Sequence, residues 1–265
     1  MRLLLPLLLA CGDSPSDSVV PWTDATCEQL FGEPGENTGL DESQCVPLIE
    51  TTDERTWTPR EWSEAEFESL ADFTLDNPPE PLGVDPYGDP DEDKSSGDPV
   101  CGALLDGSSY RLETYEDETA ALQAGARITH GGACGACSSL ADLKVYAQVQ
   151  DLTTPVRACA LENLGGDAEE NIACLEELGF TGACAEIWHY NTQNTSDACL
   201  EVCLSAFGQT YHTEDGTLNE CIQCDEDMSG PVFKAVAGRT RRNSGLATAL
   251  CRPCETVWRI EHDYQ

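Results

Sequence analysis

The chain has few basic residues for its length. Fourteen lysines and arginines stand against 49 aspartates and glutamates among 265 residues, which gives a formal net charge of −35. Such a surface repels the phosphates of nucleic acids and of anionic lipids, so we expect no nucleic-acid partner. The hydrophobic share of 40% is nevertheless enough for a packed core.

The chain also lacks a long apolar run. The run at residues 3–9 has seven apolar residues and no later segment is much longer, whereas a membrane-spanning helix needs about 20. A short apolar run after Met1 and Arg2 is typical of a secretory signal peptide. We therefore expect residues 1–10 to be a signal peptide and the mature chain to contain no membrane span.

The residues that follow this run indicate a lipid anchor. Leu8-Leu9-Ala10-Cys11 resembles the lipobox of bacterial lipoproteins, in which the peptide is cut before the cysteine and its thiol is lipidated. The resemblance implies a membrane partner through lipid on Cys11, and Gly12 favours the outer membrane in that family. We expect a cell-envelope protein, an outer-membrane lipoprotein that faces the periplasm or the exterior.

Cysteine is abundant, with 15 residues in the chain. Assigning Cys11 to a lipid leaves 14, which can pair as seven disulfides. Disulfides persist in oxidising compartments, where a lipoprotein would be found. Cys199 and Cys203 are one helical turn apart, and we expect them to bond to two other elements rather than to each other.

Three CxxC pairs occur, at 134/137, 221/224 and 251/254. The last two resemble a four-thiolate zinc site with a long insert. Because oxidation competes with metal binding outside the cell, we predict disulfides, no metal and no cofactor, with zinc and thioredoxin-like exchange as alternatives.

Composition divides the chain into segments. A helix from Pro59 to about Phe73, capped by Thr58, is expected before a stretch rich in proline, glycine and acids. The acids of that stretch are interpreted as solvated rather than as a calcium loop. The predicted segments are a signal peptide at 1–10, a tether at 11–26, a small acidic N-terminal region at 27–75, an acidic Pro/Gly linker at 76–99 and a Cys-rich globular domain at 100–265.

Periodicity in the last segment predicts an α+β fold that is mostly α-helical, a small disulfide-rich domain with a minor antiparallel sheet. Strands are expected at 109–116, 126–129 and 257–260. Helices are expected at 117–124, 138–150, 167–178, 181–191, 196–207 and 231–237.

The densest candidate for chemistry is the glycine-rich stretch that begins at His130. Cys137 precedes a predicted helix, whose N-terminus favours a thiolate. Cys134-Gly135-Ala136-Cys137 resembles the segment around the nucleophile of papain-type cysteine proteases, which implies that Cys137 is catalytic. Ser138 stands where that family has an aromatic residue, and only His262 is near the family's histidine spacing. We expect both cysteines to be disulfide halves, packed closely because of the glycines; the alternative takes Cys137 as nucleophile with His130 or His189 as base.

Four of the 14 basic residues fall within the nine positions 234–242. The guanidinium group of arginine binds carboxylate, sulfate or phosphate through two parallel hydrogen bonds. We predict an anionic-ligand site there; the alternative is that these side chains pair with acids at 225–227 or in the N-terminal region. The candidate residues are Lys234, Arg239, Arg241 and Arg242.

Three strings, at 130–143 (H-x3-C-G-x-C-S-x3-D-L), 218–226 (L-N-x-C-x-x-C-D-E) and 230–245 (G-P-x-F with R-R-x-S-G), carry a wider resemblance. Through them residues 110–254 resemble a group of Cys-rich secreted proteins of algae, oomycetes and fungi, which implies one coherent disulfide domain and adds no reaction. We hypothesise a lipid-anchored extracytoplasmic binding or interaction protein, with an anionic ligand or an envelope partner. The alternatives are a secreted cysteine-dependent hydrolase or thiol-disulfide enzyme, and a structural envelope protein.

Overall fold

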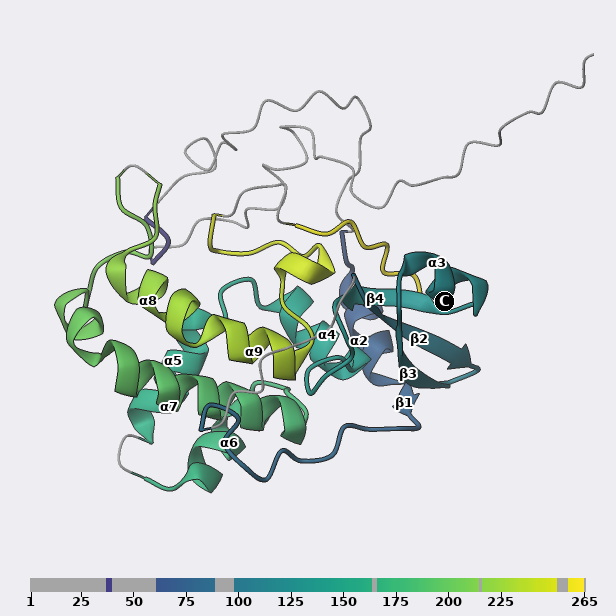
Figure 1. Cartoon of the computed structure of the whole chain (residues 1–265), viewed down its shortest axis with the longest axis horizontal. Coiled ribbons are helices and arrows are strands. Elements are labelled where there is room, and N and C mark those ends of the chain that lie inside the picture. The colour runs from purple at the N-terminus through teal and green to yellow at the C-terminus, as the bar shows by residue number, and fades with distance from the viewer. Residues whose placement is uncertain are drawn as a thin grey trace, which may run out of the picture.

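A computed structural model describes residues 37–39, 61–88, 98–163, 166–214, 216–251 and 257–264. A small sheet occupies one end of the molecule and helices α5 to α9 the other, with α2 and α4 between them (Figure 1). Five disulfides join cysteines within these ranges. The predicted α+β, mostly helical, disulfide-rich fold is confirmed. The predictions for the signal peptide, the tether and Cys11 fall outside the described ranges.

The sheet has the strand order β1-β3-β2-β4. Its main part is antiparallel: β2 (Val100–Asp106) pairs with β3 (Ser109–Tyr115) on one side and with β4 (Arg127–Gly131) on the other. β1 (Thr74–Leu75) adds a two-residue parallel pair to β3. The predicted strands at 109–116 and 126–129 are confirmed, whereas β1 and β2 were not predicted.

The strand predicted at 257–260 is wrong. These residues form no ladder, and the backbone N–H of Trp258 donates instead to the carbonyl of Arg242 in the 3₁₀ turn η2 (Arg242–Ser244). The Trp258 ring lies against Gly131, where an added Cβ would come within 2.5 Å of it. The alternation in this stretch therefore reflects packing of one aromatic ring on β4 and not a further strand.

Helix starts follow side-chain caps. The side chain of Asp117 accepts from the backbone N–H of Ala120 in the first turn of α3 (Glu118–Gln123). Ser139 caps α4 (Leu140–Gln148) in this way, and Asp167 caps α6 (Ala168–Glu177). Such caps satisfy amide groups that would otherwise have no partner. These helices and α9 (Gly230–Ala237) confirm the predictions at 117–124, 138–150, 167–178 and 231–237 to within about two residues.

The helix predicted from Pro59 begins later. α2 spans Glu64–Ala71, and Ser63 and Glu66 form a capping box in which each side chain bonds to the other's backbone. Residues 61–63 are not helical, so the predicted helix does not run through them, and the predicted cap at Thr58 lies outside the described residues. The reciprocal pair at Ser63 satisfies two amides, which is a stronger helix start than proline alone.

The two helices predicted at 181–191 and 196–207 are one helix, α7 (Gly182–Ser205). The polar residues between them bond without opening the helix: Thr192 donates to the Trp188 carbonyl, and Asn194 and Thr195 bond to Ser229 on the neighbouring element. Asn194 and Thr195 have partners outside the helix and so do not compete with its backbone, while the Thr192 hydroxyl bonds back to the preceding turn of the helix without breaking it.

Two helices were not predicted, α5 (Thr153–Glu162) and α8 (Glu220–Met228). α5 contains Pro155, which is tolerated because it lies in the first turn. α8 begins at the Asn219 cap and contains a CxxC pair. That pair was interpreted as a disulfide or metal motif and not as part of a helix.

The main core cluster joins the sheet to most of the described helices. Leu70 of α2 packs in the same cluster as Leu112 of β3, Leu143 of α4 and Ile187 of α7. Part of the predicted linker is also held on this domain: Asn77 exchanges hydrogen bonds with the backbone of Leu112, and the Tyr87 hydroxyl donates to Asn191 or to the Ser229 carbonyl. None of the described helices is long and apolar enough to cross a membrane.

Candidate functional site

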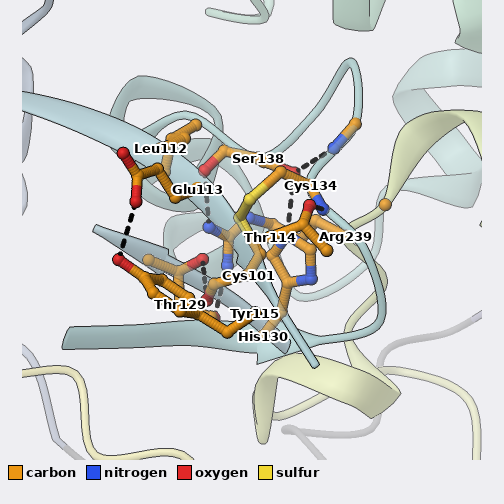
Figure 2. The surroundings of a disulfide bond; sticks show 12 residues. Cys101, Leu112, Glu113, Thr114, Tyr115, Thr129, His130, Cys134, Ser138 and Arg239 are labelled. Atoms are coloured by element: carbon orange, nitrogen blue, oxygen red, sulfur yellow. Dashed lines mark hydrogen bonds between the residues drawn. A yellow bond between two sulfur atoms is a disulfide. The ribbon is translucent and has the colours of Figure 1, made fainter. Parts of the chain in front are cut away.

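The CGAC segment is a structural junction. Cys137 is fully buried and forms a disulfide with Cys184 on α7, and Cys134 forms one with Cys101 on β2 (Figure 2). A half-cystine has no thiolate and cannot attack a carbonyl. The alternative in which Cys137 is a nucleophile is therefore wrong, and the expectation of two disulfide halves is confirmed.

The glycines of this segment allow a close approach of backbones. An added Cβ at Gly135 would lie 2.3 Å from the carbonyl oxygen of Val236 and 2.7 Å from the amide nitrogen of Gly238. The amides of Ala136 and Cys137 donate to the carbonyls of Val236 and Ala237 at 2.9 and 2.8 Å. The segment thus joins the start of α4 to the end of α9, which accounts for its composition without catalysis.

The two histidines proposed as bases have structural roles. His130 is fully buried, with Nδ1 2.8 Å from the Gly131 carbonyl and Nε2 2.7 Å from Ser138 Oγ. Burial, aided by the nearby Arg239 charge, lowers the pKa of His130 well below its usual range, so the ring is neutral. His189 bonds through Nδ1 to Asn171 at 2.9 Å, and burial lowers its pKa as well. With no thiol at Cys137 to deprotonate, both catalytic assignments are wrong.

The zinc alternative is also contradicted. Cys221 and Cys224 of α8 are bonded to Cys203 and Cys199 of α7, so two disulfides run between the same pair of helices. Cys251 is in a disulfide as well. As expected, the i,i+4 cysteines of α7 do not bond to each other, but both bond to the single helix α8 and not to two different elements.

Arg239 is inside the protein and cannot reach a ligand. Its side chain is fully buried and donates to three backbone carbonyls, each at 3.0 Å, and to Ser244 Oγ at 3.2 Å. The carbonyls belong to Thr129, Cys137 and Ser138, which tie β4 to the segment before α4 (Figure 2). The prediction of an anion-binding role for Arg239 is therefore wrong, because these internal acceptors occupy its guanidinium.

The other three predicted residues line one cavity. It has a volume of about 400 Å³ and lies among α5, α7, α8, α9 and the segment 240–250; in Figure 1, α8 and α9 run beside α7. This volume is typical of small-molecule sites. Lys234, Arg241 and Arg242 come from α9 and from the turn after it. Its apolar walls include Leu152, Val156, Trp188, Ile222, Phe233 and Leu246.

One face of α7 lines this cavity along its length. The lining side chains recur every three to four residues, which is the spacing of one helix face. They continue onto an exposed rim, where Leu161 of α5 and Leu200 of α7 are each 56% exposed. Leu204 and Phe207, also in the lining, are exposed by 66% and 77%. The α7 helix contributes Trp188, Asn191, Thr192, Thr195, Ser196, Leu200, Cys203 and Leu204.

Arg241 is the cation most deeply set in this lining. Its guanidinium donates to the carbonyls of Tyr146 and Val149, and to that of Ala247 at 2.9 Å, and it lies 5.7 Å from the centre of the Tyr146 ring. Burial lowers the pKa of Arg241 to about 10, which leaves it charged at neutral pH. It forms no ion pair with a carboxylate of the described residues.

The acids of the cavity are partly neutralised. Arg242 forms an ion pair with Glu226 at 3.2 Å, so the alternative of pairing with acids at 225–227 holds for this residue. Asp225 accepts from the Thr195 hydroxyl and from the Asn191 amide, and burial raises the pKa of its carboxyl. Arg157 of α5 also lines the cavity. It was missed because α5 itself was not predicted.

Comparison with known proteins gives a likeness to one family over part of the chain and no activity. Residues 168–260 are similar to a protein family of unknown function, DUF8771, which fits the expected likeness to an uncharacterised family. The match covers α6 to α9 and most of the cavity wall, though not α5. No curated protein and no solved structure matches the chain.

Proposed function

We propose that the chain is a lipid-anchored extracytoplasmic binding protein whose ligand occupies the cavity among α5, α7, α8 and α9. The observation that carries this proposal is the continuity between the apolar walls and the exposed rim of Leu161, Leu200, Leu204 and Phe207. Contiguous exposed apolar surface around a concavity is typical of a binding site. Two disulfides between α7 and α8 hold one wall rigid, as a preformed site requires.

The proposal is tested with a neutral apolar probe, N-phenyl-1-naphthylamine, whose fluorescence rises in an apolar site. We expect saturable binding at one site per chain. Leu200→Glu should weaken that binding at least ten-fold, because a carboxylate would then stand on the rim. Leu122→Glu is the matched control, since Leu122 is 59% exposed on α3 and lies outside the cavity lining.

Two results would contradict this function. Absence of saturable binding would favour a structural envelope protein, and equal weakening by both substitutions would place the probe on general apolar surface. The variants should melt like the native chain, because both leucines are mostly exposed.

The anchor and the location rest on the lipobox-like sequence, and eleven disulfide-bonded cysteines among the described residues fit an oxidising compartment. Expression of the full chain in a bacterium that processes lipoproteins tests the anchor. We expect a mature protein that begins at Cys11 and carries acyl chains by intact mass. Cys11→Ala should remain uncut and unacylated, and an acylated Cys11→Ala protein would contradict the assignment.

A further inference from the structure

The charge of the cavity differs from that of the whole chain. Acids outnumber bases 49 to 14 in the sequence, yet the lining contains three acids and four bases. One of the acids, Glu226, is paired with Arg242, and another, Asp225, is buried and bonded to Thr195 and Asn191. The cavity is therefore a cationic site within a strongly acidic molecule, and it favours an anion over a cation.

Arg241 supplies a charge that no carboxylate of the described residues contacts directly, although the carboxylate of Asp151 in the same lining lies near enough to favour the charged form. Its hydrogen bonds go to backbone carbonyls, which are neutral, and no carboxylate of the described residues forms an ion pair with it. Arg157, further along the lining, forms no ion pair there either. A partly buried cation that no carboxylate contacts gains from an anionic ligand that bonds to it directly, because water screens it poorly.

The remaining lining forms a long apolar track. Trp188 and Leu204 are 16 residues apart on the same helix, which corresponds to about 24 Å along the helix axis. Arg241 lies at the Trp188 end, because it stacks on Tyr146, whose ring centre is 6.4 Å from that of Trp188. The exposed residues Leu200, Leu204 and Phe207 lie at the other end of α7.

We propose that the ligand is a single-chain amphiphile with an acidic head group, either a carboxylate or a phosphate. Its head group lies against Arg241, and its apolar chain follows α7 towards Leu204 and Phe207. This inference rests on the proposed function and adds the chemical class and the orientation of the ligand. A compact hydrophilic anion would leave the apolar track uncovered, and a neutral apolar molecule would leave the Arg241 charge unpaired.

The test is displacement of N-phenyl-1-naphthylamine by a matched series of twelve-carbon compounds, used below their micelle concentrations. The series comprises dodecanoate, monododecyl phosphate, dodecanol and dodecyltrimethylammonium. We expect an acidic compound to bind at least about ten-fold more tightly than dodecanol, the scale of one charge-assisted hydrogen bond. The first two compounds distinguish a carboxylate from a phosphate head group.

Substitutions then locate the head group. Arg241→Gln should bring the affinity ratio of the acidic compound to dodecanol close to one, and Arg241→Lys should retain part of it. Arg111→Gln is the control, because Arg111 is exposed on β3 and outside the lining. If Arg241→Gln does not fold, the head-group series on the native chain still decides the proposal.

The outcomes separate the two proposals. Binding of the neutral probe with no preference for an acidic head group, or with a preference for dodecyltrimethylammonium, would overturn this inference and leave the binding function intact. A preference that survives Arg241→Gln would overturn the placement of the head group. No binding of the neutral probe would overturn the function itself, and the inference with it.

Discussion

Arg239 and Arg241 are separated by a single residue and have different surroundings. Arg239 is fully buried, and its guanidinium bonds to carbonyls of β4 and of the segment before α4. Arg241 turns the other way and lines the cavity beside Tyr146. Because both are basic residues close together in the sequence, Arg239 and Arg241 were predicted to belong to one anion-binding site. The difference depends on tertiary contacts more than 90 residues distant in sequence.

Arg239→Met should destabilise the fold strongly. The substitution leaves three buried carbonyls and Ser244 Oγ without their donor, and each unsatisfied buried group costs about 1–3 kcal/mol. We expect a loss of more than about 3 kcal/mol in chemical denaturation. A variant of native stability would show that Arg239 does not hold β4 to α4.

The contribution of His130 to stability should fall as the pH falls below about 6.5, the ordinary pKa of histidine. The folded state keeps His130 neutral, whereas the unfolded chain takes up a proton there, so protonation favours unfolding. The limiting slope for one such group is about 1.4 kcal/mol per pH unit. His189 acts in the same direction, because burial also lowers its pKa.

Thermal melts of the native chain and of His130→Gln from pH 7.5 to 5.5 isolate the contribution of His130. We expect the native chain to lose stability more steeply, whatever the absolute stability of the variant. Parallel curves would mean that His130 does not titrate differently in the two states.

At the scale of elements, the contact between the start of α4 and the end of α9 has no room for a side chain. Gly135→Ala would place a Cβ 2.3 Å from the Val236 carbonyl oxygen, so the backbone must move. We expect a loss of about 1–3 kcal/mol, as for other overpacked sites. Gly88→Ala is the control, because its nearest neighbour would be 3.6 Å away. Equal melting temperatures for the two variants would contradict the close approach.

Local periodicity predicted several of the helices. Asp117 and Asp167 stand at the start of the predicted helices 117–124 and 167–178, and each is the cap of its helix. α8 also begins at a capping residue, Asn219, and was nevertheless missed. The missed α5 contains Pro155 and β-branched residues, which lower its propensity, and tertiary packing of Val156 and Cys159 overrides that preference. The strand β2 was missed because its central residues are buried and show no alternation.

The site was predicted only in part, for the same reason. Lys234, Arg241 and Arg242 stand out as bases in an acidic chain, and all three line the cavity. Their apolar partners come from α5, α7 and α8, and no local signal in the sequence indicates that these helices enclose a space. Arg157 could have been found from the i,i+4 spacing with Leu161, but only once α5 was recognised as a helix.

At the scale of the whole molecule, disulfides link elements of the sheet and of the helical part. They join β2 to the segment before α4, that segment to α7, α5 to α6, and α7 twice to α8. Such links supplement a core that has to stabilise a chain with a net charge of −35.

The purified chain should therefore react with no thiol reagent at the described cysteines. Alkylation without reductant, under denaturing conditions and followed by peptide mapping, is expected to label none of the eleven. Full labelling after reduction is the control. A label on Cys137, Cys221 or Cys224 without reductant would contradict the disulfide assignment and reopen thiol or metal chemistry.

The proposed binding function depends most on whether the cavity beside α7 receives the ligand. The indole N–H of Trp188 reports on it directly, because Trp188 lines the cavity and this atom is buried without a hydrogen-bond partner of normal geometry among the described residues. The measurement is a ¹⁵N–¹H spectrum of the five tryptophan indoles during titration with N-phenyl-1-naphthylamine, with the Trp188 signal assigned by Trp188→Phe. We predict that the Trp188 signal moves most, and saturates with the fluorescence. A saturating titration that moves other indoles and leaves Trp188 in place would put the ligand elsewhere and contradict the account.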